Sequence, residues 1–204
     1  MIFGFGKKKV SAYKYAINLV TLSLTMKNQF ASFWNSIRHK AELDVLDEND
    51  PDLVLLFDTY NMFHIQLKDF CKLEEKNEIG AFGGIARVMY SDLYIESNPD
   101  LENFDINKFF KKSTNTFNEF HKFLNANPDG SFLLVMCYFF MSLKDIKYEE
   151  NEKYMAFAEE LSELFELASK EGWAIIRDSK EAPYLDDESL SYFNNTKKKH
   201  DLII

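Results

Sequence analysis

The chain has 204 residues, of which 46% are hydrophobic and 28% are charged, and its formal net charge is −9. This apolar content excludes a wholly disordered chain, and the length suits one globular domain. The negative charge argues against general nucleic-acid binding, so we expect no nucleic-acid partner.

Glycine and proline are scarce, with 7 and 4 residues, which favours long helices over a sheet of many strands. We interpret the 20 phenylalanines chiefly as core residues. The two cysteines, Cys71 and Cys137, lie in apolar segments and form no CxxC pair. We therefore expect buried free thiols and a reducing cytoplasm.

Residues 1–40 contain seven basic residues and no acidic one, so the remaining 164 residues carry a net charge of −16. This asymmetry is typical of an interaction arm, or of a segment that folds onto its own acidic body, which we favour. We expect no secretory signal, because Lys14 and Asn18 interrupt the apolar stretch that a signal needs.

The spacing of apolar residues predicts a basic amphipathic helix over about residues 10–38. Its stripe steps by three or four residues and consists of Leu19, Leu22, Met26, Phe30, Phe33 and Ile37. Such a helix is either a wall of a helical bundle, which we favour, or a binder of a partner groove. Peripheral membrane contact through residues 1–38 is a further alternative.

Residues 42–52, ELDVLDENDPD, form an acidic linker that we expect to cap the next helix through Asp50 or Asp52. A calcium loop fits poorly, because Asp52 stands where such a loop needs glycine. The next helix is predicted from Leu53 to about Leu73 by its regular apolar spacing.

A glycine-rich stretch, IGAFGGIAR, begins at Ile79 and lacks the pattern of a phosphate-binding loop. We interpret Gly80, Gly83, Gly84 and Arg87 as a candidate site for a small apolar or anionic ligand. Alternatively, these small residues allow helices to approach closely. A further helix, rich in phenylalanine on one side, is predicted from Phe104 to Leu124.

Residues 131–143, SFLLVMCYFFMSL, contain no charge and follow a turn at residues 127–130. The run is too short to span a bilayer, so we predict a buried central helix, with a buried strand as the alternative.

The segment from about Tyr148 to Lys170 has the pattern of a helix with one apolar stripe and a row of glutamates. We expect Gly172 to end it, and residues 173–176 to form a short non-helical segment. Residues 177–204 are polar, and we predict an extension with a short helix, Asp186–Phe193, and a mobile tail.

These patterns predict an all-α fold: a bundle of about six helices in one domain over residues 1–176, followed by the extension over 177–204. We find no catalytic motif, no metal-ligand spacing among the four histidines, and no cofactor motif. We therefore expect no cofactor and no metal, and favour a protein that is not an enzyme.

The function that we favour is a cytoplasmic protein-protein interaction module, such as an adaptor, inhibitor or immunity-type binder. It would bind a protein partner through its acidic surface or its basic first helix. The residues of this candidate surface are Lys7, Lys8, Lys9, Lys14, Glu159, Glu160, Glu163 and Glu166. The alternatives are a small-ligand-binding protein and a helical enzyme with a carboxylate-based site.

Overall fold

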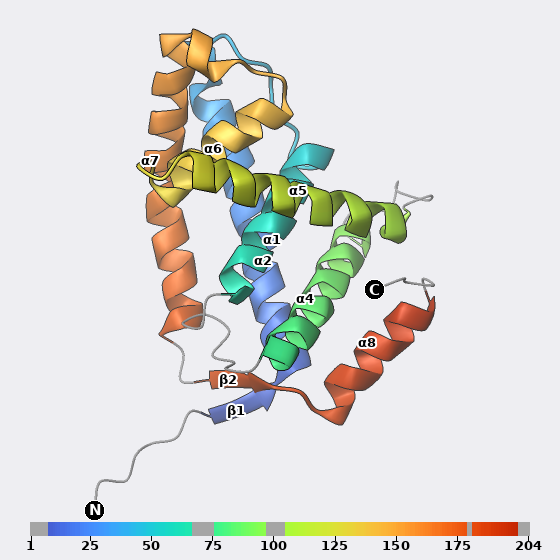
Figure 1. Ribbon diagram of the computed structural model, residues 1–204. Coiled ribbons are helices and arrows are strands. Elements are labelled where there is room, and N and C mark those ends of the chain that lie inside the picture. Colours follow the sequence, from blue (N-terminus) through green and yellow to red (C-terminus); the bar gives the residue numbers. More distant parts are fainter. Residues whose placement is uncertain (1–7, 67–75, 97–104, 179–180, 200–204) are drawn as a thin grey trace, which may run out of the picture. The chain divides into compact units, whose positions relative to one another are not determined.

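The computed structural model describes residues 8–66, 76–96, 105–178 and 181–199 (Figure 1). These residues form seven α-helices, two strands and two short 3-10 helices, so the predicted all-α class is confirmed. The α-helices are α1 (Ala12–Ile37), α2 (Pro51–Gln66), α4 (Lys76–Glu96), α5 (Ile106–Ala126), α6 (Phe132–Leu143), α7 (Glu152–Arg177) and α8 (Asp187–Lys199). The other elements are β1 (Lys8–Ser11), η1 (Arg38–Lys40), η2 (Tyr148–Glu150) and β2 (Glu181–Tyr184).

The chain is divided into two compact units. Unit 1 consists of residues 1–22, 61–111 and 174–204, and unit 2 consists of residues 23–60 and 112–173. Helices α1, α2, α5 and α7 each contribute residues to both units. The single domain over residues 1–176, and the separate extension, stay predictions.

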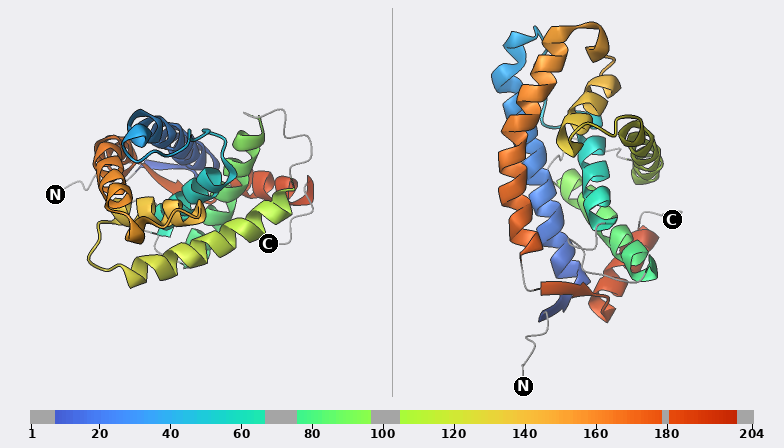
Figure 2. Two further views of the ribbon diagram at one scale, coloured as in Figure 1. Left: turned by 90° about the horizontal axis from the view of Figure 1, so that it is seen from above. Right: turned by 60° about the vertical axis from the view of Figure 1, so that its left-hand side comes forward.

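The core of unit 2 is built from aromatic rings, as the phenylalanine content suggested. Phe30 of α1 lies at its centre, buried completely, and α1 and α7 run side by side in this unit (Figure 2). The ring of Phe30 meets the rings of three other helices edge-on, at centroid distances of 5.5 to 5.8 Å. These partners are Phe57, Phe140 and Phe165. Edge-to-face pairs of this kind add about 0.5–1.5 kcal/mol each beyond the area that they bury.

The predicted central helix over residues 131–143 is present as α6. Ser131 caps it, since its side chain accepts a hydrogen bond from the Leu134 backbone N–H. Six of its twelve residues are buried. Helix α2 is still more enclosed, because every residue from Leu53 to Tyr60 is buried, so burial extends beyond the apolar stripe that predicted this helix.

Unit 1 contains the only sheet among the described residues, a parallel pair of four-residue strands that the sequence did not predict. Lys8 pairs with Glu181, and Ser11 pairs with Tyr184. Neither strand shows a clear alternation of apolar and polar residues, and Pro183 lies within β2, so the usual signals of a strand are missing.

The prediction of a non-helical segment at residues 173–176 is wrong. Helix α7 continues through Gly172 and ends at Arg177. The reason is a tertiary contact: Trp173 is buried, and its indole N–H donates a hydrogen bond to the Tyr60 hydroxyl at 2.7 Å. Burial of this large side chain on the helical stripe outweighs the cost of about 1 kcal/mol for a glycine inside a helix.

The tail that was predicted to be mobile from residue 194 is partly helical among the residues that the structure describes. Helix α8 is longer than the expected Asp186–Phe193 and continues to Lys199. The aromatic side chain of Phe193 lies 3.0 Å from the position of a Cβ atom built on Gly84, so α8 packs against α4 (Figure 1). Residues 200–204 lie outside the described residues.

Candidate functional site

The four glutamates predicted as an acidic surface all lie on α7, in unit 2. Glu159, Glu163 and Glu166 are exposed, and Glu160 is partly exposed. Glu160 forms an ion pair with Lys40 at 2.6 Å, and Glu166 forms one with Lys170 at 2.5 Å. No cation of the described residues pairs with Glu159 or Glu163.

Two exposed leucines lie among these glutamates on α7. Leu164 is 37% exposed and Leu167 is 67% exposed. They are three residues apart, so both side chains lie on neighbouring positions of one helix face. We call Glu159, Glu163, Leu164, Glu166 and Leu167 the α7 face.

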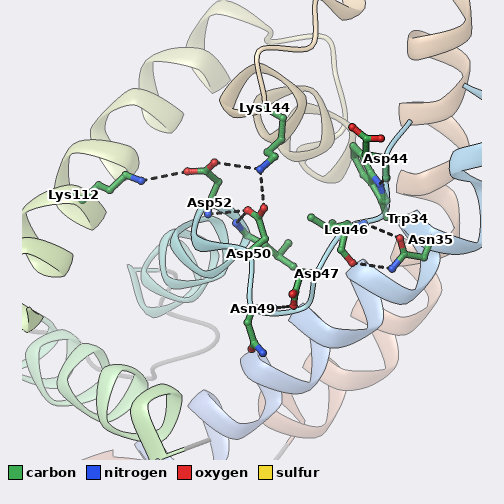
Figure 3. A network of polar contacts seen from close by, with 11 residues as sticks. Trp34, Asn35, Asp44, Leu46, Asp47, Asn49, Asp50, Asp52, Lys112 and Lys144 are labelled. Atoms are coloured by element: carbon green, nitrogen blue, oxygen red, sulfur yellow. Dashed lines mark hydrogen bonds and ion pairs between the residues drawn. The ribbon is translucent and has the colours of Figure 1, made fainter. Parts of the chain in front are cut away.

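The part of the acidic linker that precedes α2, residues 42–50, is held in place by polar side chains of α1 (Figure 3). The amide of Asn35 makes two hydrogen bonds of 2.9 Å with the backbone of Leu46, and the indole of Trp34 donates to the Asp44 carbonyl at 3.0 Å. Lys27 is buried and donates a hydrogen bond to the Glu48 backbone carbonyl. Burial lowers the pKa of Lys27, although the negative charge of Glu48 acts to raise it.

The prediction that Asp50 caps the following helix is confirmed. One oxygen of its carboxylate accepts hydrogen bonds from the backbone N–H groups of Asp52 and Leu53, at 3.0 and 3.3 Å. Its other oxygen accepts from Lys144 at 2.7 Å, and Asp52 pairs with Lys112 at 3.3 Å (Figure 3). Burial favours a lower pKa for Lys144, but the contact with Asp50 outweighs it, so the pKa is raised. These carboxylates stabilise the start of α2.

The excess negative charge of the chain lies entirely in unit 2. The residue ranges of this unit contain nine lysines and arginines and 18 aspartates and glutamates, a net charge of −9. The ranges of unit 1 contain 15 residues of each sign and are therefore neutral. The α7 face thus belongs to a strongly acidic unit.

The lysines predicted as a second part of the candidate surface lie in unit 1. Lys8 and Lys9 belong to β1, and Lys14 belongs to the first turn of α1. All three line one open hollow, together with residues of β2 and the start of α8. Lys7 lies outside the described residues. The structure therefore assigns the lysines and the glutamates to different units.

The apolar stripe of α1, which would have to be exposed to contact a membrane or a partner groove, is largely buried. Leu19, Met26, Phe30 and Ile37 are all buried. This arrangement agrees with the interpretation of α1 as a wall of the fold.

The glycine-rich candidate site lies inside α4, where two of its three glycines face side chains of other helices. A Cβ atom on Gly84 would lie 3.0 Å from the ring of Phe193, and one on Gly83 would lie 3.3 Å from the side chain of Met62. Arg87 donates a hydrogen bond to the Phe110 carbonyl at 3.1 Å, and its guanidinium lies 5.0 Å from the centre of the Phe110 ring. Gly80 has no neighbour within 4 Å of such a Cβ.

Buried polar groups that sequence reasoning missed lie in unit 2. The hydroxyl of Tyr60 accepts a hydrogen bond from Trp173 and shares another, of 2.7 Å, with Ser169. Burial raises the pKa of Tyr60 to about 12. The hydroxyl of Ser113 donates to the carboxylate of Asp58, which is fully buried. These contacts join helices that are distant in sequence, so no local pattern reveals them.

Cys137 is a buried free thiol, as expected, and burial raises its pKa. Cys71 lies outside the described residues. Within residues 8–66, 76–96, 105–178 and 181–199, no group of three or more histidine, cysteine, aspartate or glutamate side chains is arranged to hold a metal ion.

In the same part of the chain, every helix is too short or too polar to cross a bilayer.

Comparison of the chain with protein-family models, with curated proteins and with solved structures gives no match.

Proposed function

We propose that this protein is a non-catalytic protein-binding module whose α7 face binds a basic partner. The observation that carries the proposal is the exposure of Leu164 and Leu167 between glutamates on one helix of a unit with net charge −9. Exposed leucines supply apolar area to a contact, and the surrounding carboxylates favour a partner with lysines or arginines.

The ion pairs of unit 2 support this choice of face. Several other carboxylates of unit 2 already pair with a lysine: Asp50 and Asp52 meet Lys144, and Glu42 meets Lys153 at 3.0 Å. Glu159 and Glu163 have no such role within the described residues. Their charges are therefore available to a partner.

The partner chemistry that fits best is an amphipathic helix with an apolar face and basic flanks. Leu164 and Leu167 are one helical turn apart, which matches the spacing of the anchors on a second helix packed alongside. The cytoplasm is the proposed compartment, since two lone cysteines suit a reducing environment.

A photo-cross-linking experiment in the source cells tests this proposal. Benzoylphenylalanine replaces Leu167 in the full chain, and in a matched control it replaces Leu190, an exposed leucine of α8 in unit 1. We expect a discrete protein adduct at position 167 whose cross-linked peptide contains lysines or arginines, and no such adduct at position 190. The absence of an adduct at 167, or the same adduct at both positions, would overturn the proposal.

A further inference from the structure

The hollow in unit 1 has the volume of a small-molecule binding site, and its lining is rich in charged side chains. Its volume is about 690 Å³ and it is open to solvent. Pockets that bind small molecules have volumes of about 300–1,000 Å³. Its walls come from β1, the first two turns of α1, β2 and the start of α8.

Two of the three carboxylates in this hollow are engaged by other groups of the protein. Glu181 pairs with Lys8 at 3.6 Å. Asp186 accepts hydrogen bonds from the Ser11 hydroxyl at 3.1 Å, from the Ser189 backbone N–H at 2.9 Å, and from the Ser189 hydroxyl. These donors and the amino-terminal end of α8 compensate the charge of Asp186.

Two of the three lysines in the hollow form no ion pair with a carboxylate of the described residues. Lys9 and Lys14 are exposed, and no carboxylate of the described residues lies within ion-pair distance of either. Asn18, one helical turn after Lys14, adds an amide donor on the same side of α1. No acidic residue lies in the first turn of α1, so the positive end of this helix adds to the same field.

We propose that this hollow binds a phosphate group, held by the ammonium groups of Lys9 and Lys14 and by the amide of Asn18. Two flexible ammonium groups and one neutral donor suit a compact anion with several acceptor oxygens. Glu188, the one other carboxylate of the hollow, is exposed and opposes such an anion, so the affinity is modest. The phosphate group belongs to a soluble phosphomonoester or to a lipid headgroup.

This site is independent of the α7 face, because it consists only of residues of unit 1. A negative result in the hollow therefore leaves the proposed function untouched, and the reverse also holds.

The test is a titration of the isotopically labelled full chain with inorganic phosphate and pyrophosphate, observed by amide NMR at constant ionic strength. We expect saturable shifts at β1, β2 and the start of α1, and a dissociation constant that is about tenfold weaker in Lys9→Gln/Lys14→Gln. Lys8→Gln is the matched control, since Lys8 already pairs with Glu181. Glu188→Gln should bind more tightly than the unaltered chain.

The amide spectrum and the unfolding midpoint of each variant show whether it is folded. Shifts that do not saturate, or equal affinities of the unaltered chain, Lys8→Gln and Lys9→Gln/Lys14→Gln, would contradict the proposal. Vesicles of phosphatidylcholine with a minority of phosphatidic acid form a second arm. Binding to these vesicles that the Lys9→Gln/Lys14→Gln change removes identifies the headgroup as the source. Binding of pyrophosphate without vesicle binding identifies a soluble phosphate compound.

Discussion

The hydroxyl of Tyr60 satisfies two buried polar groups of unit 2 at once. It accepts from the Trp173 indole and shares a hydrogen bond with Ser169, each at 2.7 Å. Because all three side chains are buried, water cannot replace a lost partner. This contact also explains why α7 extends past Gly172.

Replacing Tyr60 with phenylalanine should lower the stability of the protein, although the change removes only the hydroxyl group. We predict that Tyr60→Phe lowers the free energy of unfolding by about 1–3 kcal/mol, since it removes the hydrogen bonds that the Tyr60 hydroxyl makes with two buried side chains. Urea unfolding of the two proteins measures the difference. Tyr138→Phe, at a half-buried position, is the control and should change stability by less than about 0.5 kcal/mol. Equal costs would contradict this account of Tyr60.

Asp186 joins the starts of α1 and α8 through Ser11 and Ser189, and the Tyr13 backbone N–H donates to the Ser189 hydroxyl at 2.9 Å. Burial acts to raise the pKa of Asp186, but the hydrogen bonds from Ser189 and Ser11 outweigh it and hold the pKa below its ordinary value of 3.8. The folded protein therefore favours the ionised carboxylate.

Because the pKa of Asp186 is lowered in the folded protein, the stability of the protein should depend on pH in the acidic range. The charge of Asp186 contributes stability above the pKa of the unfolded chain, and this contribution is lost as the pH falls through the lower pKa of the folded protein. We expect the unaltered chain to be more stable than Asp186→Asn at pH 7, and the difference to shrink as the pH falls below the ordinary carboxyl pKa of 3.8. Chemical unfolding at a series of pH values measures it. A difference that grows in acid would contradict the lowered pKa.

At the scale of the element, α4 shows how glycines in one helix have different roles. The space beside Gly80 is open, whereas Gly84 faces the ring of Phe193 from α8. A sequence pattern of three glycines cannot separate these cases, because the difference lies in a contact between residues that are 109 positions apart in the chain.

Alanine substitutions at these two positions should therefore act in opposite directions. Gly80→Ala should stabilise the protein by about 0.5–1 kcal/mol, since alanine favours a helix and meets no neighbour. Gly84→Ala should destabilise it by about 1–3 kcal/mol, because the new methyl group would lie 3.0 Å from the Phe193 ring. Thermal and urea unfolding measure both changes. Stabilisation by Gly84→Ala would show that α8 does not pack as described.

The helices themselves were largely predictable, and the reasons are local. Apolar spacing located α1, α5 and most of α7, and the uncharged apolar run located α6. Asp50 or Asp52 was expected to cap the next helix because carboxylates stabilise helix starts, and Asp50 does so. The strands were not predictable, because four-residue segments paired across most of the chain carry almost no local signal. The continuation of α7 through Gly172 depends on Trp173 meeting Tyr60, which no local pattern contains.

At the scale of the whole molecule, charge is divided between the two units. The sequence showed a basic beginning and an acidic remainder, but the division into units separates a neutral unit 1 from an acidic unit 2. The candidate glutamates were found from sequence because they form a row on a regular helix. The exposure of Leu164 and Leu167 could not be predicted from the sequence, because an apolar residue beside a buried stripe has the same spacing pattern as the stripe itself.

The central claim is that Glu159 and Glu163 provide the charge that holds a basic partner on the α7 face. The most direct test compares two double variants of equal charge, Glu159→Gln/Glu163→Gln and Glu149→Gln/Glu150→Gln, which alter exposed glutamates of unit 2. The dissociation constant for the partner captured at position 167 is measured for both variants and the unaltered chain, at low and at high salt.

We predict that the α7 variant binds about tenfold more weakly at low salt, that the control variant binds within about twofold of the unaltered chain, and that high salt narrows the difference. Equal affinities of the two variants, or a complex that salt does not weaken, would contradict the claim.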